Sequence, residues 1–141
     1  MSCVLRAIGR SFDVDAFLSA STIAGDAVFH RGEPRAPEKP DGEKRTASGF
    51  NARIGESDMD DLEGQLQDAV HFLVEHGDEL RRLGSFDGVE EVCLEFAIRR
   101  RAGAVQSDVF PADLLWRAGA LDLDLVVTHF DAGPEGRRIA P

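Results

Sequence analysis

The stretch GVEEVCLEFAIRRR, residues 88–101, decides the fold of this chain because its apolar and polar side chains alternate with a period of two. One expected face carries Val92, Leu94, Phe96 and Ile98, and the other carries Cys93, Glu95, Ala97 and Arg99. Such alternation is typical of a strand that is buried on one side only. It predicts an antiparallel or mixed sheet with helices covering one face.

Segments of both kinds surround this strand along the chain. Alternating patterns predict further strands at residues 3–8, 26–31, 49–56 and 121–130, and helical spacing predicts helices within residues 11–21, 57–83 and 110–119. The first six elements follow the order βαββαβ, the ferredoxin-like split motif, and an extra αβ unit follows at the C-terminus. We therefore expect an α+β fold with a ferredoxin-like core.

The long helical segment, residues 57–83, carries its own boundary signals. Ser57 followed by Asp60 resembles a capping box, with aspartate in place of the usual glutamate or glutamine, so we expect the helix to begin there. Apolar residues continue at helical spacing as far as Leu83. Gly77 lies inside this pattern, and we expect it to break or bend the helix.

Between the second and third expected strands, residues 32–48 contain three prolines and two glycines. This composition predicts a surface loop. A chain of 141 residues supports one hydrophobic core, so we expect a single domain over residues 1–131. Residues 132–141 are expected to form a flexible C-terminal tail.

The chain is acidic, with 26 Asp and Glu residues against 16 Lys and Arg residues and a formal net charge of -10. Binding to nucleic acid draws most of its free energy from lysines and arginines that neutralise phosphates, so this charge argues against nucleic acid as a partner. A basic protein or a cationic ligand is the favoured partner class instead.

Neither a membrane span nor a disulfide framework is expected. The apolar runs, such as residues 125–127, are far shorter than the roughly 20 residues that a bilayer requires. The first residues lack the pattern of a signal peptide. Cys3 and Cys93 form no C-x-x-C pair. These features predict a cytoplasmic protein whose thiols stay reduced.

Four stretches of the chain resemble a known bacterial family. They are FDVDAFL (12–18), VFHRGEPR (28–35), SGFNARIG (48–55) and FPADLLWRAGALDLDLVVTHF (110–130). Together they are similar to the domain-of-unknown-function 4279 family, and the resemblance runs from about residue 4 to residue 130. It implies a small bacterial α+β protein and brings no established activity with it.

The second of these stretches, VFHRGEPR, also carries the main candidate for a binding site. His30, Arg31 and Arg35 could together hold an anion, since arginine forks bind carboxylates and phosphates well. Against this, Glu33 can neutralise either neighbouring arginine, and a proline ends the strand. We favour a turn with local ion pairs and keep the three residues as the alternative, a site for an anion.

A second basic cluster, residues 99–101, follows the strand that opened this section. In a ferredoxin-like sheet the ends of the second and fourth strands lie at opposite edges, so Arg31 and Arg99 are not expected to share a site. We interpret the cluster as charges that end a strand and solvate a loop.

The remaining residues that could carry chemistry indicate no catalytic residue, no metal site and no cofactor. His71 and Glu75 have the spacing of a ligand pair on a helix, but no third ligand accompanies them. Cys93 lies in the middle of a strand, where a thiol is packed and inert. The carboxylates within residues 58–63 open a helix and complement its dipole.

Trp116 is the most informative apolar side chain. On a helix it points away from Leu114, Leu115 and Ala118, which share a face. Tryptophan is highly buried on average, so we favour a loop or the tail as its cover. An exposed Trp116 would instead mark an interface with a partner.

The leading hypothesis is a non-enzymatic binding or interaction module, of which an immunity-type inhibitor that caps a basic toxin is one concrete version. The alternative is a small enzyme or a binding protein for an anion or small metabolite, built on His30, Arg31 and Arg35. A third reading is a homodimer that pairs through an uncovered strand edge. Under all three, neither nucleic acid nor a membrane is an expected partner.

Overall fold

The computed structural model describes residues 3–103 and 105–131. Within these residues the chain forms five strands and four helices, and none of the helices is long and apolar enough to cross a membrane. In chain order the elements are β1 (Cys3–Gly9), α1 (Val14–Ser19), β2 (Ala27–Phe29), β3 (Ser48–Ile54), α2 (Leu62–Glu75), α3 (Gly77–Ser85), β4 (Glu91–Arg99), α4 (Ala112–Ala120) and β5 (Asp124–Phe130). The predicted α+β class is confirmed. The expected tail, residues 132–141, lies outside the described residues.

The first strand of the chain, β1, lies at the centre of the sheet. The strand order is β2-β3-β1-β4-β5, in which β1 pairs antiparallel with β3 and with β4, β2 pairs antiparallel with β3, and β5 runs parallel to β4. The connection from β4 to β5 passes through α4, because two parallel neighbours need a crossover. The C-terminal αβ unit therefore adds its strand beside β4, at the edge of a mixed sheet.

The predicted βαββαβ order is not reproduced in full, because two helices connect β3 to β4 where one was expected. The helix α2 ends at Glu75 and α3 begins at Gly77. Between them His76 has φ -110° and ψ 21°, which interrupts the helical backbone. The break predicted near Gly77 is confirmed.

The start predicted for this helical segment is wrong. The N-cap of α2 is Asp61, whose carboxylate accepts a hydrogen bond from the backbone N–H of Gly64 at 2.9 Å. The preceding residues form a separate turn, in which the backbone N–H of Asp61 donates to the carbonyl of Asp58. The predicted capping box placed the first turn of the helix at these residues, where the structure has this separate turn instead.

The alternation predicted for residues 88–101 is confirmed in β4. Its four larger apolar side chains, Val92, Leu94, Phe96 and Ile98, are all buried. The small residues Cys93 and Ala97, on the opposite face, are buried as well. Beneath α1 and α3 the core is aromatic, and the rings of Phe17 and Phe50 stack with their centroids 5.9 Å apart.

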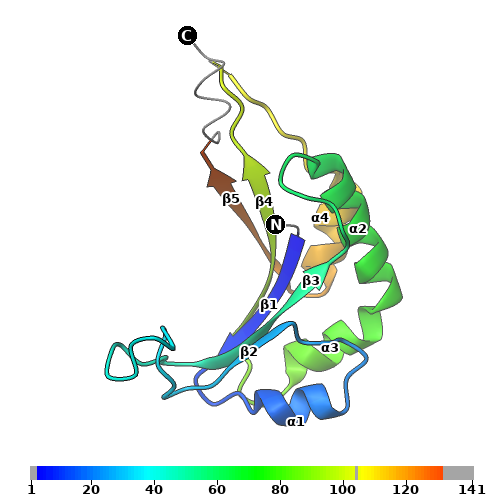
Figure 1. Ribbon diagram of the computed structural model, residues 1–141. Helices are drawn as coiled ribbons and strands as arrows, with labels where there is room; N and C mark the ends of the chain where they lie inside the picture. Colours follow the sequence, from blue (N-terminus) through cyan, green and yellow to red (C-terminus); the bar gives the residue numbers. More distant parts are fainter. Residues whose placement is uncertain (1–2, 104, 132–141) are drawn as a thin grey trace.

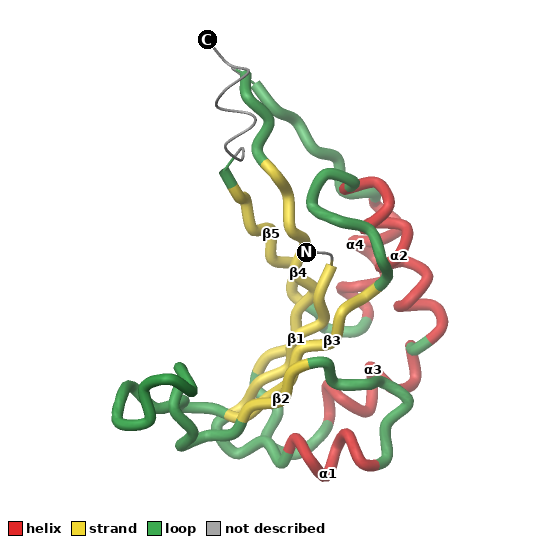
Figure 2. Tube along the Cα trace, viewed as in Figure 1, coloured by secondary structure: helices red, strands yellow, loops and turns green. Residues whose placement is uncertain are grey.

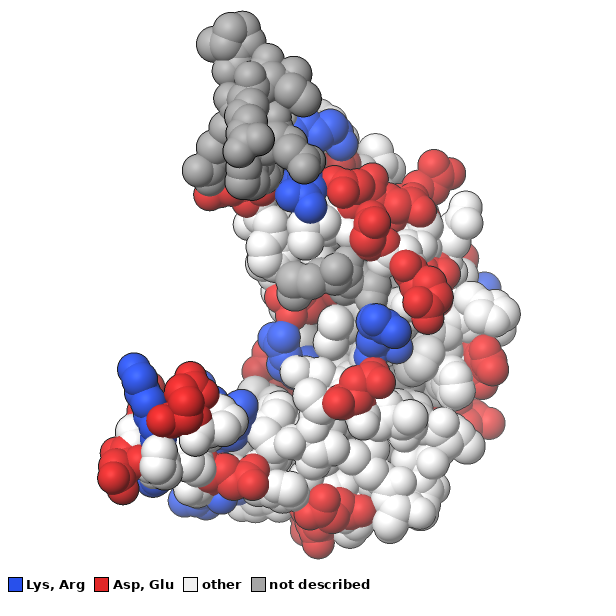
Figure 3. Space-filling model, in the orientation of Figure 1, with Lys and Arg blue, Asp and Glu red and all other residues white. Residues whose placement is uncertain are grey.

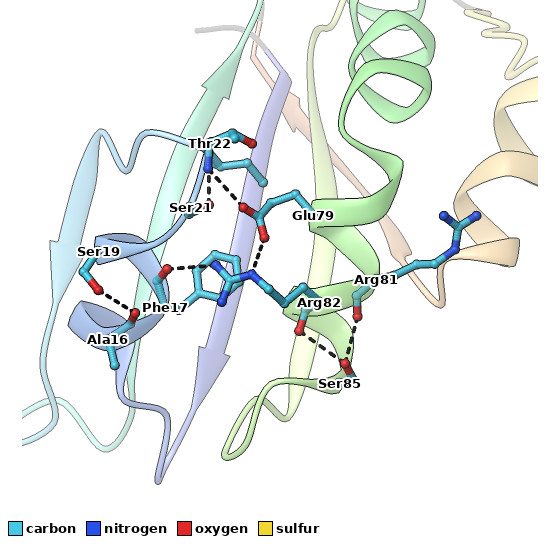
Figure 4. A network of polar contacts seen from close by, with 10 residues as sticks. Ala16, Phe17, Ser19, Ser21, Thr22, Glu79, Arg81, Arg82 and Ser85 are labelled. Atoms are coloured by element: carbon cyan, nitrogen blue, oxygen red, sulfur yellow. Dashed lines mark hydrogen bonds and ion pairs between the residues drawn. The ribbon is translucent and has the colours of Figure 1, made fainter.

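Arg82, on α3, fastens this helix to α1 (Figure 4). Its guanidinium lies 4.1 Å from the ring centroid of Phe17, and its Nη2 donates to the Phe17 carbonyl at 3.0 Å. It also pairs with Glu79, whose second oxygen accepts from the backbone N–H of Thr22 at 3.0 Å. The hydrogen bond from Arg82 holds the pKa of Glu79 below its usual value. The network thus joins α3 to the segment that leads into β2.

Gln65, on α2, continues the pairing of β4 beyond the end of β1. Its side chain is completely buried. Its Nε2 donates to the carbonyl of Ala97 at 2.8 Å, and its Oε1 accepts from the N–H of the same residue at 3.2 Å. The side-chain amide of Gln65 therefore bonds to the N–H and carbonyl of Ala97 on the side of β4 where a neighbouring strand would otherwise pair.

All four helices lie on the convex side of the curved sheet (Figures 1 and 2). We call the concave side the open face, because none of the helices in the described part of the chain covers it. By the strand register, the open face carries alternate residues of each strand, among them Phe29, Asn51, Arg6, Glu95 and Thr128. A sheet with helices on one face was predicted and is confirmed.

The segment expected to be a surface loop contains no helix or named strand between β2 and β3, and its residues 31–46 form a ribbon of two paired arms that projects from the sheet (Figure 1). Pro34 and Lys44 form an isolated antiparallel bridge. The N–H of Gly32 donates to the carbonyl of Arg45 at 2.9 Å, and the N–H of Arg35 donates to that of Glu43 at 2.9 Å. Gly32 has φ 93°, which favours glycine at the base of the ribbon.

Candidate functional site

A polar row crosses the open face from β3 to β5. The Nε of Arg6 donates to Oδ1 of Asn51 at 3.1 Å, and its Nη2 donates to Oε1 of Glu95 at 2.5 Å. The second oxygen of Glu95 accepts a hydrogen bond from the hydroxyl of Thr128. Each of the four residues comes from a different strand, so the register of the sheet sets the geometry of the row.

Beside this row the ribbon and the sheet enclose a groove of about 410 Å³, which we call the ribbon groove. It is lined by Arg6, Ile8, Ala27, Val28, Phe29, Arg35, Arg45, Thr46, Ala47 and Asn51. Three strands supply the sheet side of the groove, and the ribbon supplies the remaining wall. Figure 3 shows the molecule hollowed beside the projecting ribbon.

Gly49, on β3, allows the floor of the groove to form. A Cβ at this position would lie 2.2 Å from the carbonyl oxygen of Ala7 and 2.9 Å from the Phe29 ring. Any side chain there would displace the ring, so the absence of one lets Phe29 lie close over β3. The guanidinium of Arg45 then lies 4.5 Å from the Phe29 ring centroid.

The three arginines of the groove differ in how far they are neutralised. Arg6 is paired with Glu95. Arg35 lies 3.4 Å from Glu43, and both side chains are half or more exposed, which makes this a weak pair. Arg45 stacks on Phe29 and forms no ion pair with any residue in the described ranges. The groove is therefore basic, although the chain as a whole is acidic.

The structure separates the three residues predicted to bind an anion. Arg35 lines the ribbon groove, whereas His30 and Arg31 are not among its lining residues. The His30 ring lies 2.8 Å from Asp15 and 3.1 Å from Glu33, and the hydrogen bond to Asp15, followed by that to Glu33, raises the pKa of His30. Of His30, Arg31 and Arg35, the ribbon groove therefore includes Arg35 and not the other two.

The backbone of Arg31 has a structural role at the exit of β2. Its N–H donates to the hydroxyl of Ser48, at the start of β3, at 2.8 Å. The local pairing of His30 with Glu33 matches the favoured interpretation of this stretch as a turn with ion pairs.

The second basic cluster lies at the other end of the sheet, as predicted. The register places Phe29, at the end of β2, level with Gly49, Ile8 and Glu91, and Arg99 ends β4 on the far side. Arg99 pairs with Asp60 at 2.8 Å. A small hollow of about 210 Å³ at this end is lined by Arg100, Arg101, Gly103, Gln106, Asp108 and His129.

Trp116 is 70% exposed, so no loop among the described residues covers it, and the tail that was the other expected cover lies outside the described residues. Leu115, which was expected to share the buried face, is 48% exposed. Leu114 and Ala118 are the residues of α4 that pack into the core. The helix therefore presents two neighbouring large apolar side chains to solvent.

The two thiols are buried, as was predicted for Cys93. Burial raises the pKa of the Cys3 thiol to about 12 and also raises that of Cys93. His71 and Glu75, whose spacing is that of a ligand pair on a helix, lie 3.3 Å apart and contact each other. Within residues 3–103 and 105–131, the structure contains no group of three His, Cys, Asp or Glu residues arranged to hold a metal ion.

Sequence reasoning missed Arg6, Phe29, Arg45 and Asn51 as site residues. The sequence did contain one signal for Arg6. It is the single charged residue in a short apolar strand, and it lies on the strand face opposite the buried residues. The sequence contained no such signal for Arg45. This residue lies next to Phe29, at the end of β2, because the two arms of the ribbon pair with each other.

The comparisons with known proteins give no match. No protein-family model matches the chain, no curated protein sequence is significantly similar to it, and no solved structure matches it significantly. The resemblance to the domain-of-unknown-function 4279 family therefore stays a prediction.

Proposed function

We propose that this protein is a non-enzymatic binding module that holds its partner on the open face of the sheet. One observation carries the proposal: the helices cover the convex side, while the concave side presents a polar row and a groove beside the ribbon. A concave surface with a mixture of apolar and well-placed polar groups is typical of a binding site.

The polar row supports this role because its side chains are fixed before a partner arrives. Arg6 is held by Asn51 and Glu95, and Glu95 is held by Thr128, so these groups lose little conformational entropy on binding. The polar row also lies near the centre of the open face, so a partner docked there would exclude water from these side chains.

A second surface is favoured by Trp116. Exposed tryptophans are frequent anchors of protein interfaces, and Leu115 beside it enlarges the apolar surface. We propose this part of α4 as the second candidate for partner binding.

The wider expectations are carried forward as proposals. The compartment is proposed to be the cytoplasm. An immunity-type inhibitor of a basic toxin would use the acidic surface before and at the start of α2, whose exposed carboxylates are Glu56, Asp58, Asp60, Asp61 and Glu63. Four of these have local roles. Asp61 caps α2, Asp60 pairs with Arg99, Glu56 lies 3.8 Å from Arg53, and Asp58 accepts a hydrogen bond from the N–H of Asp60, so we rank this surface below the open face.

We further infer that β1 to β4 represent a ferredoxin-like split motif to which α3, α4 and β5 have been added. The antiparallel pairing of β1 with both β3 and β4 supports this relationship.

The test is affinity capture of proteins and small molecules from the source organism, with the bound material identified by mass spectrometry. Four forms of the protein are compared: wild type, the open-face variant Arg35→Glu/Arg45→Glu, the α4 variant Trp116→Ala, and the control Arg81→Glu. Arg81 lies on α3, on the convex side, and among the described residues its one ion pair is with the exposed Asp78.

We expect bound material to be shared by the wild type and the control and to be lost from the open-face variant. Loss from the Trp116→Ala variant alone would move the site to α4. Material that all four forms retain equally, or no bound material with the wild type, would contradict the proposal for both surfaces.

A further inference from the structure

We propose that the ribbon groove binds a small organic carboxylate that has a flat apolar part, with Arg45 as the main contact for the carboxylate and Phe29 as a contact for the apolar part. The inference rests on the proposed function, because it takes the open face as the binding surface, and it names the class of ligand.

The charge of the groove selects an anion. Of the ten residues that line it, three are arginines, and in the described part of the chain no Asp or Glu joins that lining. This contrasts with the formal net charge of -10 for the chain as a whole. An anion would gain attraction here while the rest of the surface repels it, so the groove is locally specialised for negative charge.

Arg45 is the arginine best placed to receive that charge. Arg6 is already bonded to Glu95 and Asn51, and Arg35 lies beside Glu43. Arg45 instead lies over the Phe29 ring, and its N–H groups have no ion-pair partner among the described residues. A guanidinium can form two parallel hydrogen bonds with one carboxylate.

The remainder of the lining selects a flat apolar group. Ile8, Ala27, Phe29 and Ala47 contribute apolar surface next to the arginines. A volume of about 410 Å³ lies within the range of sites for small organic ligands. Aromatic rings stack on one another and on guanidinium groups, so the Phe29 and Arg45 pair suits an aromatic or conjugated carboxylate.

Inorganic phosphate fits this lining less well. Besides the arginines, Thr46 and Asn51 are the polar lining residues, and Asn51 is already bonded to Arg6. A phosphate would leave the apolar half of the groove unfilled, whereas an organic carboxylate covers both halves.

The probe is 2-naphthoate, compared with the uncharged 2-naphthamide and with inorganic phosphate. Binding is measured by calorimetry and located by two-dimensional NMR of the labelled protein. Arg45→Gln is compared with Arg31→Gln, which removes the same charge from the same ribbon at a residue outside the groove lining. Arg45→Lys provides a second variant, which keeps the charge. The comparison of 2-naphthoate with 2-naphthamide tests the need for the carboxylate in the wild-type protein, without any substitution.

We expect 2-naphthoate to shift the resonances of Phe29 and Arg45 and to bind more tightly than either 2-naphthamide or phosphate. Arg45→Gln should weaken its binding by at least about tenfold, and Arg31→Gln should leave it unchanged. Arg45→Lys should weaken it to an intermediate degree, since lysine keeps the charge and lacks the planar fork.

Three results would overturn the inference: no binding of 2-naphthoate, equal binding of the acid and the amide, or equal losses in Arg45→Gln and Arg31→Gln. If one of these occurs while the open-face variant still loses its captured partner, the binding surface is correct and the ligand class is wrong. If the captured material also persists in that variant, the open face itself is not the site.

Discussion

The side-chain amide of Gln65 forms two hydrogen bonds with the backbone of Ala97, one to its carbonyl and one from its N–H. This is the pairing that a neighbouring strand would supply, and it occurs where β4 extends beyond β1. A third bond joins the Gln65 Nε2 to the carbonyl of Asp58 at 2.6 Å. One buried side chain on α2 thereby joins the sheet, the helix and the turn that precedes it.

Replacing Gln65 with leucine should lower the free energy of unfolding by about 2–4 kcal/mol, because the buried N–H and carbonyl of Ala97 would both lose the side-chain amide that bonds to them. Urea denaturation measures the change. Gln67→Leu, at an exposed position of the same helix, is the control and should change stability by less than about 0.5 kcal/mol. Equal effects at the two positions would contradict the role of Gln65.

Substitution of two glycines should change stability in opposite directions. Gly49→Ala places a Cβ against the Ala7 carbonyl and the Phe29 ring, so it should destabilise the protein by about 1–3 kcal/mol and disturb the ribbon groove. Gly84→Ala, in α3, meets no atom within 4 Å and should stabilise the helix by up to about 1 kcal/mol. Thermal unfolding of both variants checks the contrast, and a Gly49→Ala protein as stable as wild type would show that the floor of the groove is not tightly packed.

His30 should add stability at low pH, because its pKa is raised by Asp15 and Glu33. A raised pKa means that the folded state binds the proton more tightly than the unfolded chain, whose histidine titrates near pH 6.5. The contribution is therefore complete below about pH 6.5 and is lost as the pH rises through the folded-state value.

Urea denaturation of wild type and His30→Asn across this range should show a difference in unfolding free energy that shrinks as the pH rises. The effect is small because the side chains are well exposed. NMR titration of the His30 ring should give a midpoint above 6.5, and a midpoint at or below that value would contradict the ion pairs.

Both thiols should resist a disulfide reagent in the folded protein at pH 8. Cys3 is fully buried and Cys93 is 4% exposed, and burial raises both pKa values, that of Cys3 to about 12. Reaction with Ellman's reagent should therefore be slow until urea unfolds the chain, when two thiols per molecule react. Rapid reaction of one thiol without denaturant would indicate that its strand opens.

The parts of the fold that were predicted correctly are those with a strong local period. The alternation in residues 88–101 identified β4 and the face of the strand that carries its large apolar side chains, although Cys93 and Ala97 on the other face are buried as well. The break at Gly77 was also predictable from a local signal, because glycine weakens a helix at the position where it occurs. The start of α2 was not predictable in this way, since several acidic residues before Leu62 are equally good caps.

The candidate site depends on contacts between distant residues, which a local pattern does not encode. Arg6 and Glu95 are 89 residues apart and meet only because β1 and β4 are neighbours. The ribbon segment was predicted as a surface loop from its prolines and glycines, which indicate turns and do not indicate the pairing between its two arms. His30 and Arg35 are close in sequence, yet the ribbon turns them to different surroundings.

The central position of β1 has a consequence for how the protein is made. This strand leaves the ribosome before both of its partners, β3 and β4, which begin at Ser48 and Glu91. The middle of the sheet therefore cannot close until β4 has been synthesised, and the many long-range pairings predict slow folding of this domain. During that interval the apolar side of β1 is exposed, so the nascent chain is expected to depend on chaperones more than the finished protein does.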